Sequence, residues 1–182
     1  MSASQPIRVG VSSCLLGERV RWDGGDKRSA FVADRLASTV ELVPVCPEVE
    51  LGLGVPREPI RLEDGGSGLR LVDTETHLDL GPRMDGWAKA RALELSALPL
   101  CGFVLKAGSP SCGMENVPIW REPNGPKRGR AEPRPEGRGR FAEALIRAMP
   151  DLPIIEEGAL ANPQARDRWL ERVHALHRST AC

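Results

Sequence analysis

Short apolar runs alternate with longer amphipathic stretches along this chain, and the alternation predicts strands and helices that follow one another. The predicted strands span residues 8–12, 40–45, 102–105 and 152–156, and the predicted helices span 29–37, 84–96, 141–149 and a last segment that begins near Pro163. In that last segment Trp169, Val173 and Leu176 recur at i, i+4 and i+7, which predicts one apolar helix face. The alternation favours an α/β fold: a single Rossmann-like domain whose mostly parallel sheet carries helices on both faces.

Other parts of the chain are less regular. Residues 69–72 and 76–80 are predicted to form a hairpin. Residues 124–139 are rich in Gly, Pro and Arg, which predicts a mobile surface loop. No stretch has the composition of an interdomain linker, so we expect residues 1–182 to form one domain.

Composition excludes several classes of protein. The chain has 182 residues, of which 41% are hydrophobic and 27% charged, as in an ordinary globular domain. Its formal net charge is zero, which gives no electrostatic case for bulk binding to nucleic acid or membranes. It has no apolar run of membrane-spanning length, and its first residues lack the pattern of a signal peptide. We therefore expect a cytoplasmic protein with no membrane partner.

The five cysteines are odd in number and widely dispersed, unlike a secreted disulfide framework. Cys14, Cys46 and Cys112 each follow a predicted strand, and the carboxyl ends of parallel strands meet at one edge of a sheet. Pro47 would stiffen the turn after Cys46. Small residues flank Cys112, leaving room for a bulky group and exposing amides that can donate hydrogen bonds to sulfur. The three thiols are therefore candidate metal ligands.

Spacing alone leaves other interpretations of the cysteines open. No C-x-x-C pair occurs, which argues against common zinc and thioredoxin-like motifs. For Cys14, a small buried turn residue is an equal alternative to a ligand. Cys101 lies inside an apolar stretch and favours a core position, whereas Cys182 ends the chain.

Six ordered blocks resemble one family, the thiouracil desulfidases, long known as a bacterial domain of unknown function. The blocks read GVSSCLLG (10–17), VRWDGG (20–25), VCPEVELGLG (45–54), PREPIRL (56–62), LKAGSPSCG (105–113), and GRFA (139–142) followed by EEG (156–158). The resemblance extends over about residues 7–177. One departure is Trp22, which stands where many relatives have tyrosine.

The resemblance implies an enzyme that converts the thiocarbonyl of a thiolated uracil base or nucleotide to a carbonyl and releases sulfide. It implies a four-iron–four-sulfur cluster held by Cys14, Cys46 and Cys112, with one iron left open. It also implies that Glu48 and Ser109 act as acid–base residues. Taken without the family, Glu48 would be a solvated carboxylate at a turn and Ser109 a turn residue.

Further residues of these blocks are candidate substrate contacts: Ser13, Trp22, Arg57 and Lys106. Arg57 and Arg61 lie on a segment kept extended by prolines, where they either contact substrate or form surface salt bridges. A basic cluster between Lys127 and Arg140 is predicted to be a solvated loop rather than a site for a nucleotide phosphate or RNA, because Glu132 and Glu136 interrupt it.

Two other functions compete with the desulfidase. A non-catalytic iron–sulfur protein that senses oxygen or carries electrons would use the same cysteines but would give Glu48 and Ser109 no role. A zinc protein would combine the three cysteines with one histidine, and the histidines (His77, His174 and His177) all lie outside the cysteine blocks.

Overall fold

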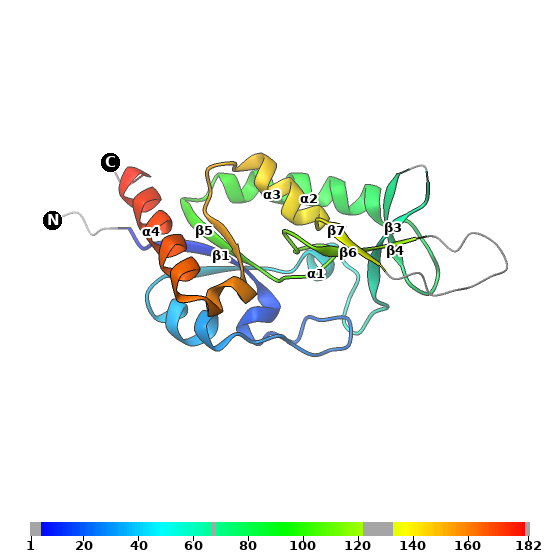
Figure 1. Ribbon diagram of the computed structural model, residues 1–182, viewed down its shortest axis with the longest axis horizontal. Helices are drawn as coiled ribbons and strands as arrows, with labels where there is room; N and C mark the ends of the chain where they lie inside the picture. The colour runs from blue at the N-terminus through cyan, green and yellow to red at the C-terminus, as the bar shows by residue number, and fades with distance from the viewer. Residues whose placement is uncertain (1–4, 67, 122–132, 181–182) are drawn as a thin grey trace.

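The computed structural model describes residues 5–66, 68–121 and 133–180 and contains two four-stranded β-sheets arranged along the long axis of the molecule (Figure 1). In the first sheet the strand order is β2-β1-β5-β8 and every neighbouring pair is parallel. Its strands are β1 (Arg8–Ser12), β2 (Glu41–Val45), β5 (Leu100–Leu105) and β8 (Ile154–Glu156). The four strands predicted from apolar runs are therefore confirmed, with boundaries shifted by at most two residues.

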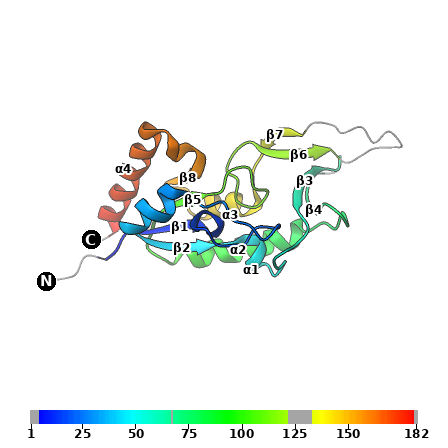
Figure 2. The ribbon, with the colours of Figure 1, turned by 90° about the horizontal axis from the view of Figure 1, so that it is seen from below.

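Helices cover both faces of this first sheet, as predicted (Figures 1 and 2). On one face lie α2 (Gly81–Ser96) and α3 (Arg140–Ala148). On the other lie α4 (Pro163–Thr180) and an irregular π/3-10 segment, η2 (Phe31–Arg35) and η3 (Leu36–Ser38).

Two apolar clusters hold these layers together. In α4, Trp169 and Val173 are buried against β1 and β5 residues, and Leu176 is only half-buried. The cluster beneath α2 and α3 centres on Phe103 and Phe141, whose ring centroids are 5.9 Å apart in an edge-to-face arrangement. The sheet is thus buried on both faces, which is typical of parallel strands.

A second, mixed sheet corrects the prediction of a single, mostly parallel one. Its order is β4-β3-β6-β7, with β3 (Ile60–Asp64) parallel to β6 (Val117–Arg121) and antiparallel to β4 (Leu69–Asp73). Strands β3 and β6 were not predicted. The first hides a charged residue, Glu63, on its buried side, and the second contains Pro118; both features weaken a strand pattern.

The predicted pairing of 69–72 with 76–80 is confirmed only in part. The two segments share an isolated antiparallel bridge, Val72 to Asp79, whereas the ladder partner of β4 over its whole length is β3. The predicted loop at 124–139 is also wrong in part. Residues 122–132 of this region lie outside the described residues, but β7 (Arg134–Gly137) pairs antiparallel with β6.

Helix α2 links the two sheets. Met84 near its start is buried among residues of the second sheet, whereas Ala88 and Leu95 pack beneath the first. This shared helix supports the expectation of one domain, which stays a prediction. No helix within the described residues is long and apolar enough to cross a membrane.

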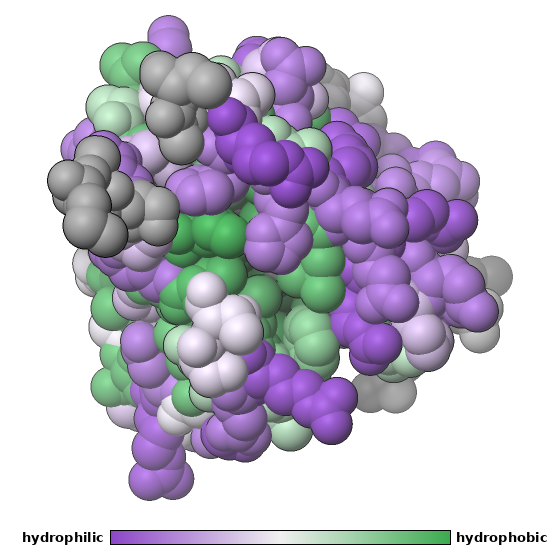
Figure 3. All heavy atoms as spheres, turned by 90° about the vertical axis from the view of Figure 1, so that its left-hand side faces the viewer, coloured by the Kyte–Doolittle hydropathy of each residue, from purple (hydrophilic) through white to green (hydrophobic). Residues whose placement is uncertain are grey.

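The two ends of the first sheet differ in character. Seen from the end that carries α4, apolar side chains gather in the middle of the face and hydrophilic ones surround them (Figure 3). The carboxyl ends of β1, β2 and β5 point the other way, toward the second sheet (Figure 2). The candidate site lies at these carboxyl ends.

Candidate functional site

A pocket of about 320 Å³ lies where β1, β2 and β5 end and β3 begins. Sheets of this kind bind ligands beyond the carboxyl ends of their strands, most often where the strand order reverses, here between β1 and β5. Nine of the candidate residues line this pocket: Ser13, Cys14, Trp22, Cys46, Glu48, Arg57, Lys106, Ser109 and Cys112. The fold therefore brings together segments almost 100 residues apart.

The chain leaves β1 through a 3-10 turn, Ser13–Leu16, which ends at Gly17 with a left-handed φ of 91°. Leu15 is fully buried in the core and anchors this turn. Cys14 on the same turn keeps part of its surface exposed and lines the pocket. Its carbonyl accepts hydrogen bonds from the amides of Gly17 and Lys27, which fixes the backbone of the turn.

Cys46 lies between β2 and a one-turn helix, α1 (Pro47–Glu50). Pro47 occupies the first helical position, where its missing N–H is tolerated and its fixed φ suits the helix. The amide of Cys46 donates to Glu50 Oε1 at 3.2 Å, and Glu50 Oε2 lies 2.9 Å from Arg91 Nε of α2. These contacts hold the end of β2 while Glu48, on the first turn of α1, reaches the pocket.

The loop that carries Cys112 follows β5. Ser109 Oγ accepts hydrogen bonds from the amides of Ser111 at 3.2 Å and Cys112 at 3.1 Å. Behind the loop, the amides of Phe141 and Ala142 at the start of α3 both donate to the carbonyl of Ser111, at 3.0 and 3.1 Å. Gly139 makes this packing possible, since a Cβ there would lie 2.4 Å from that same carbonyl.

Burial raises the pKa of all three pocket thiols. The pKa of Cys14 rises to about 11 and that of Cys46 to about 12, mainly through desolvation and further through the Glu48 carboxylate. The pKa of Cys112 lies well above its ordinary value for the same two reasons, although a hydrogen bond with Ser12 opposes the rise. The thiols are therefore neutral at pH 7, and a bound cation is what would favour their thiolates.

This set of donors fits an iron–sulfur cluster better than a single metal ion. Cysteine thiolates are the usual ligands of such clusters, and each thiolate binds a different iron, so the sulfurs need not converge on one point. Cys14, Cys46 and Cys112 lie near enough to influence one another electrostatically. Among the described residues, no group of three or more His, Cys, Asp or Glu side chains converges closely enough to hold one metal ion.

The histidines give the zinc alternative no support. His77 Nδ1 lies 3.7 Å from Glu63 on the second sheet, and His177 Nδ1 lies 3.7 Å from Cys101 Sγ. His174 lines a separate surface hollow on α4. Cys101 is buried in the first sheet, as predicted.

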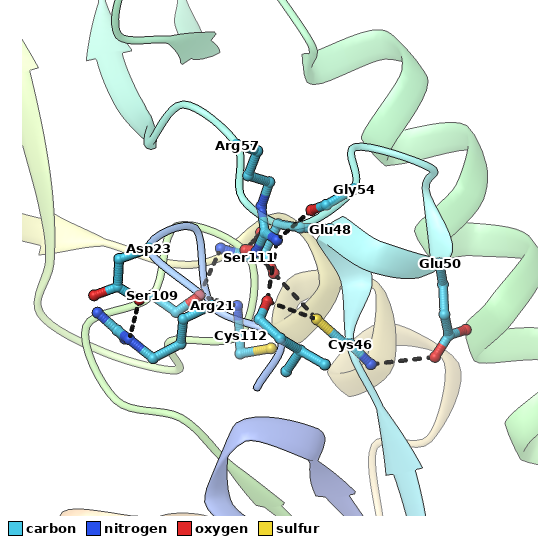
Figure 4. Close-up of polar contacts among 11 residues, drawn as sticks. Arg21, Asp23, Cys46, Glu48, Glu50, Gly54, Arg57, Ser109, Ser111 and Cys112 are labelled. Atoms are coloured by element: carbon cyan, nitrogen blue, oxygen red, sulfur yellow. Dashed lines mark hydrogen bonds and ion pairs between the residues drawn. The ribbon is translucent and has the colours of Figure 1, made fainter. Parts of the chain in front are cut away.

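Glu48 is held from several sides (Figure 4). Its Oε1 accepts a hydrogen bond of 2.6 Å from Ser111 Oγ. Its Oε2 lies 3.5 Å from Arg57 Nη2 and 3.7 Å from Cys46 Sγ. Only 13% of the Glu48 side chain is exposed, so this carboxylate is not the solvated turn residue that the sequence left open.

The side chain of Arg57 is also largely buried, so its ion pair with Glu48 is not a surface salt bridge. Its side chain is 9% exposed, and its Nη1 donates to the carbonyls of Val20 at 3.0 Å and Gly54 at 2.8 Å. Arg61 points away from the pocket, where it pairs with Glu63 and lies over the ring of Trp120 at 5.3 Å. Of the two arginines, Arg57 alone lines the pocket.

Lys106 at the end of β5 is paired with Glu157 just beyond β8. Glu157 also accepts a hydrogen bond of 2.6 Å from the amide of Ala107, and the amide of Lys106 donates to Ser12 Oγ at 3.0 Å. Trp22 is 44% exposed on the pocket wall. Arg21 and Lys27 line the same pocket.

Sequence reasoning gave no role to three residues that the structure places in this network: Ser12, Ser111 and Glu157. Each lies inside one of the six blocks, and Ser12 and Ser111 directly precede the candidate residues Ser13 and Cys112. The signal that was available was the second serine of SPSC and the second glutamate of EEG.

The described part of the basic cluster, Arg134, Arg138 and Arg140, does not line this pocket. Lys127, Arg128 and Arg130 lie outside the described residues. The remaining three arginines are paired with carboxylates: Arg134 with Asp64 at 2.9 Å, Arg138 with Glu143 at 3.1 Å, and Arg140 with Asp85 at 3.4 Å. These pairs favour a structural role over a phosphate site.

Comparisons with known proteins agree with this geometry. Residues 9–157 match the family described as 2-thiouracil desulfurase. A solved structure of a 4Fe–4S-dependent thiouracil desulfidase, TudS, superposes with a TM-score of 0.58 at 32% identity and covers 85% of this chain and 93% of its own. The uncharacterized protein YbbK of Bacillus subtilis (strain 168) is 35% identical over 111 residues, which are 57% of this chain and 71% of YbbK.

Proposed function

Because this chain belongs to the 2-thiouracil desulfurase family, we propose that it is an iron–sulfur-dependent desulfidase that hydrolyses the thiocarbonyl of a thiolated uracil base or nucleotide. The observation that supports this most directly is the meeting of three thiols, two buried and one half-buried, with the Glu48 carboxylate in one pocket. A pocket of about 320 Å³ suits a small ligand. Cys14, Cys46 and Cys112 are the residues that would hold a four-iron–four-sulfur cluster.

Three protein ligands would leave one iron of such a cluster open, and that iron would supply Lewis acidity toward a thiocarbonyl sulfur. In the reaction, water adds to the thiocarbonyl carbon, the carbon–sulfur bond breaks, and one carbonyl product and one hydrogen sulfide result. No electrons are gained or lost. The reaction therefore needs water, a base and a proton donor, but no external reductant.

Glu48 is the residue we assign as general base. It takes a proton from water as the oxygen attacks carbon and returns one to the departing sulfur. Its fixed position two residues after Cys46 keeps the carboxylate beside the cysteines, and positioned proton transfer of this kind typically contributes about 10²–10⁴-fold to a rate. Arg57 supplies the positive charge that stabilises this carboxylate, which is largely removed from solvent.

We assign Ser109 the role of orienting the attacking water or relaying its proton. Its oxygen already accepts two backbone N–H groups, so its own hydrogen is directed away from those amides. It lines the pocket and can donate to water or substrate from there. On the same wall, the exposed ring of Trp22 offers an apolar surface for a pyrimidine, and Ser13 and Lys106 offer polar contacts.

The test is anaerobic purification or reconstitution, measurement of iron and sulfide per chain, and incubation with 2-thiouracil, 4-thiouracil and their nucleotides. We expect sulfide release from at least one of them without added reductant. An intact cluster with no sulfide release from any thiopyrimidine would overturn the proposal. Glu48→Ala separates an enzyme from an electron carrier or sensor, since only the enzyme needs the carboxylate.

A further inference from the structure

Ser111 is a fully buried polar residue beside a proposed cluster ligand, Cys112. A buried hydroxyl needs a hydrogen-bond partner, because leaving one unsatisfied inside a protein is unfavourable. Its Oγ donates to Glu48 Oε1 at 2.6 Å, within the range of short, charge-assisted bonds. The loop that carries Cys112 and the helix that carries Glu48 are therefore joined by one contact (Figure 4).

The two oxygens of Glu48 have unequal surroundings. Oε1 is held by the short bond from Ser111, whereas the contacts to Oε2 are longer, at 3.5 Å from Arg57 Nη2 and 3.7 Å from Cys46 Sγ. A hydrogen bond of 2.6 Å restricts the carboxylate more than contacts of that length. Oε2 is therefore the less restricted of the two oxygens, and it can accept a further hydrogen bond from a water molecule while Arg57 stays beside it.

Backbone hydrogen bonds hold Ser111 in place, and so they fix the position from which its hydroxyl donates to Glu48. Its carbonyl accepts two amides of α3, from Phe141 and Ala142, and its own amide donates to Ser109 Oγ. A Cβ on Gly139 would overlap the carbonyl carbon and oxygen of Ser111, both 2.4 Å away. The hydroxyl thus projects from a segment that is closely packed against a helix.

We propose that Ser111 is a positioning residue that anchors Glu48 through Oε1 and thereby fixes the position of Oε2 beside Cys46 Sγ. The inference rests on the proposed function, in which Glu48 is the general base. It assigns to Ser111 a role distinct from that of Ser109, whose hydroxyl contacts two backbone amides rather than the carboxylate. Ser111 acts through Glu48 and does not itself touch the reacting atoms.

A simpler role would be to fill space beside Cys112, and a double-mutant cycle separates the two. Ser111→Ala removes the hydroxyl, Glu48→Gln keeps the shape of the side chain but removes its basicity, and the double variant combines them. Ser96→Ala is the matched control, because Ser96 Oγ donates only to the carbonyl of Leu93 on the exposed side of α2. Each variant is purified anaerobically, with iron and sulfide counted per chain.

In the loaded enzyme, Ser111→Ala should lower kcat by about 10- to 100-fold, the range expected for one hydrogen bond to a charged group. KM and iron content should stay near those of the parent. In the Glu48→Gln background, adding Ser111→Ala should change kcat by less than about threefold, because the anchored base is already gone. Ser96→Ala should match the parent throughout.

In the cluster-free protein, urea unfolding gives a readout that does not depend on activity. The effects of Ser111→Ala and Glu48→Gln on the unfolding equilibrium constant should be coupled by about fivefold or more, since the two side chains touch. Effects that multiply independently, in either kcat or unfolding, would overturn the inference. So would a Ser111→Ala enzyme with full kcat, or one that loses its iron. A fully active Glu48→Gln would instead overturn the proposed role of Glu48.

Discussion

Arg57 Nη2 lies 3.5 Å from Glu48 Oε2, and both side chains are almost entirely removed from solvent. The guanidinium is held in turn by two backbone carbonyls, those of Val20 and Gly54. The carboxylate beside the cysteines therefore has a permanent positive neighbour that cannot easily move away. Removing either charge would therefore leave the other nearly buried in the pocket without its partner.

Arg57→Met should lower the free energy of unfolding by about 3 kcal/mol, because it leaves Glu48 charged and nearly buried without its partner. Urea unfolding of the cluster-free protein measures this. Glu48→Gln in the same background should recover part of the loss, since the unpaired charge is removed. A double variant as unstable as the sum of the two single variants would show that the pair contributes nothing.

Glu48→Gln should lower kcat by about 10²–10⁴-fold, the usual contribution of a positioned proton-transfer group. Iron and sulfide per chain should stay unchanged, because Glu48 is not a ligand in this account. Steady-state assays of sulfide release, alongside visible absorbance, measure both quantities. Loss of the cluster together with activity would instead make Glu48 part of the cluster's support.

Replacing Cys14, Cys46 or Cys112 singly by serine should remove most of the iron and the activity with it. Cys101→Ser is the matched control, because Cys101 is buried in the sheet and lies outside the pocket. Iron counts after anaerobic reconstitution decide the result. Retention of a full cluster in any of the three pocket variants would contradict the proposed ligand set.

The cluster-free protein should lose stability as the pH rises above about 9. Burial raises the pKa of Cys14 to about 11 and of Cys46 to about 12 from an ordinary value of 9.0, so the folded state holds these protons more tightly than the unfolded chain does. The stability they contribute is complete below pH 9 and is lost as the pH rises through their folded pKa values.

Urea midpoints measured from pH 8 to about 11.5 test this linkage. A Cys14→Ser/Cys46→Ser variant should lose less stability over the same range, since it lacks the two thiols. Identical slopes for the two proteins would mean that these thiols do not titrate differently on folding.

The strands of the first sheet and the residues of the site could be predicted from the sequence more fully than the strands of the second sheet. Apolar runs at 8–12 and 102–105 are buried on both faces, which gives continuous hydrophobic segments that are easy to recognise. Strand β3 instead buries Glu63 against Arg61 and Arg70, and β7 is written Arg-Pro-Glu-Gly. Such strands depend on tertiary partners, so local pattern alone does not reveal them.

Residue types and the positions of strand ends predicted which residues would share the pocket. They did not predict which side chains would form hydrogen bonds with one another. Both serines of SPSC follow the same strand, and only coordinates show that the hydroxyl of Ser111 reaches Glu48 while that of Ser109 accepts backbone amides. Arg57 likewise had two interpretations until its burial behind Glu48 was known. Side-chain direction in a loop depends on contacts with distant elements, here α3.

The most direct measurement of the central claim is a single-turnover reaction of the anaerobically loaded protein with a thiouracil substrate in ¹⁸O-labelled water, without reductant. We predict one sulfide released per product and one ¹⁸O atom in the new carbonyl, with Glu48→Gln strongly slowed and its cluster intact. An intact cluster that yields neither sulfide nor labelled carbonyl, or release that requires an external electron donor, would contradict it.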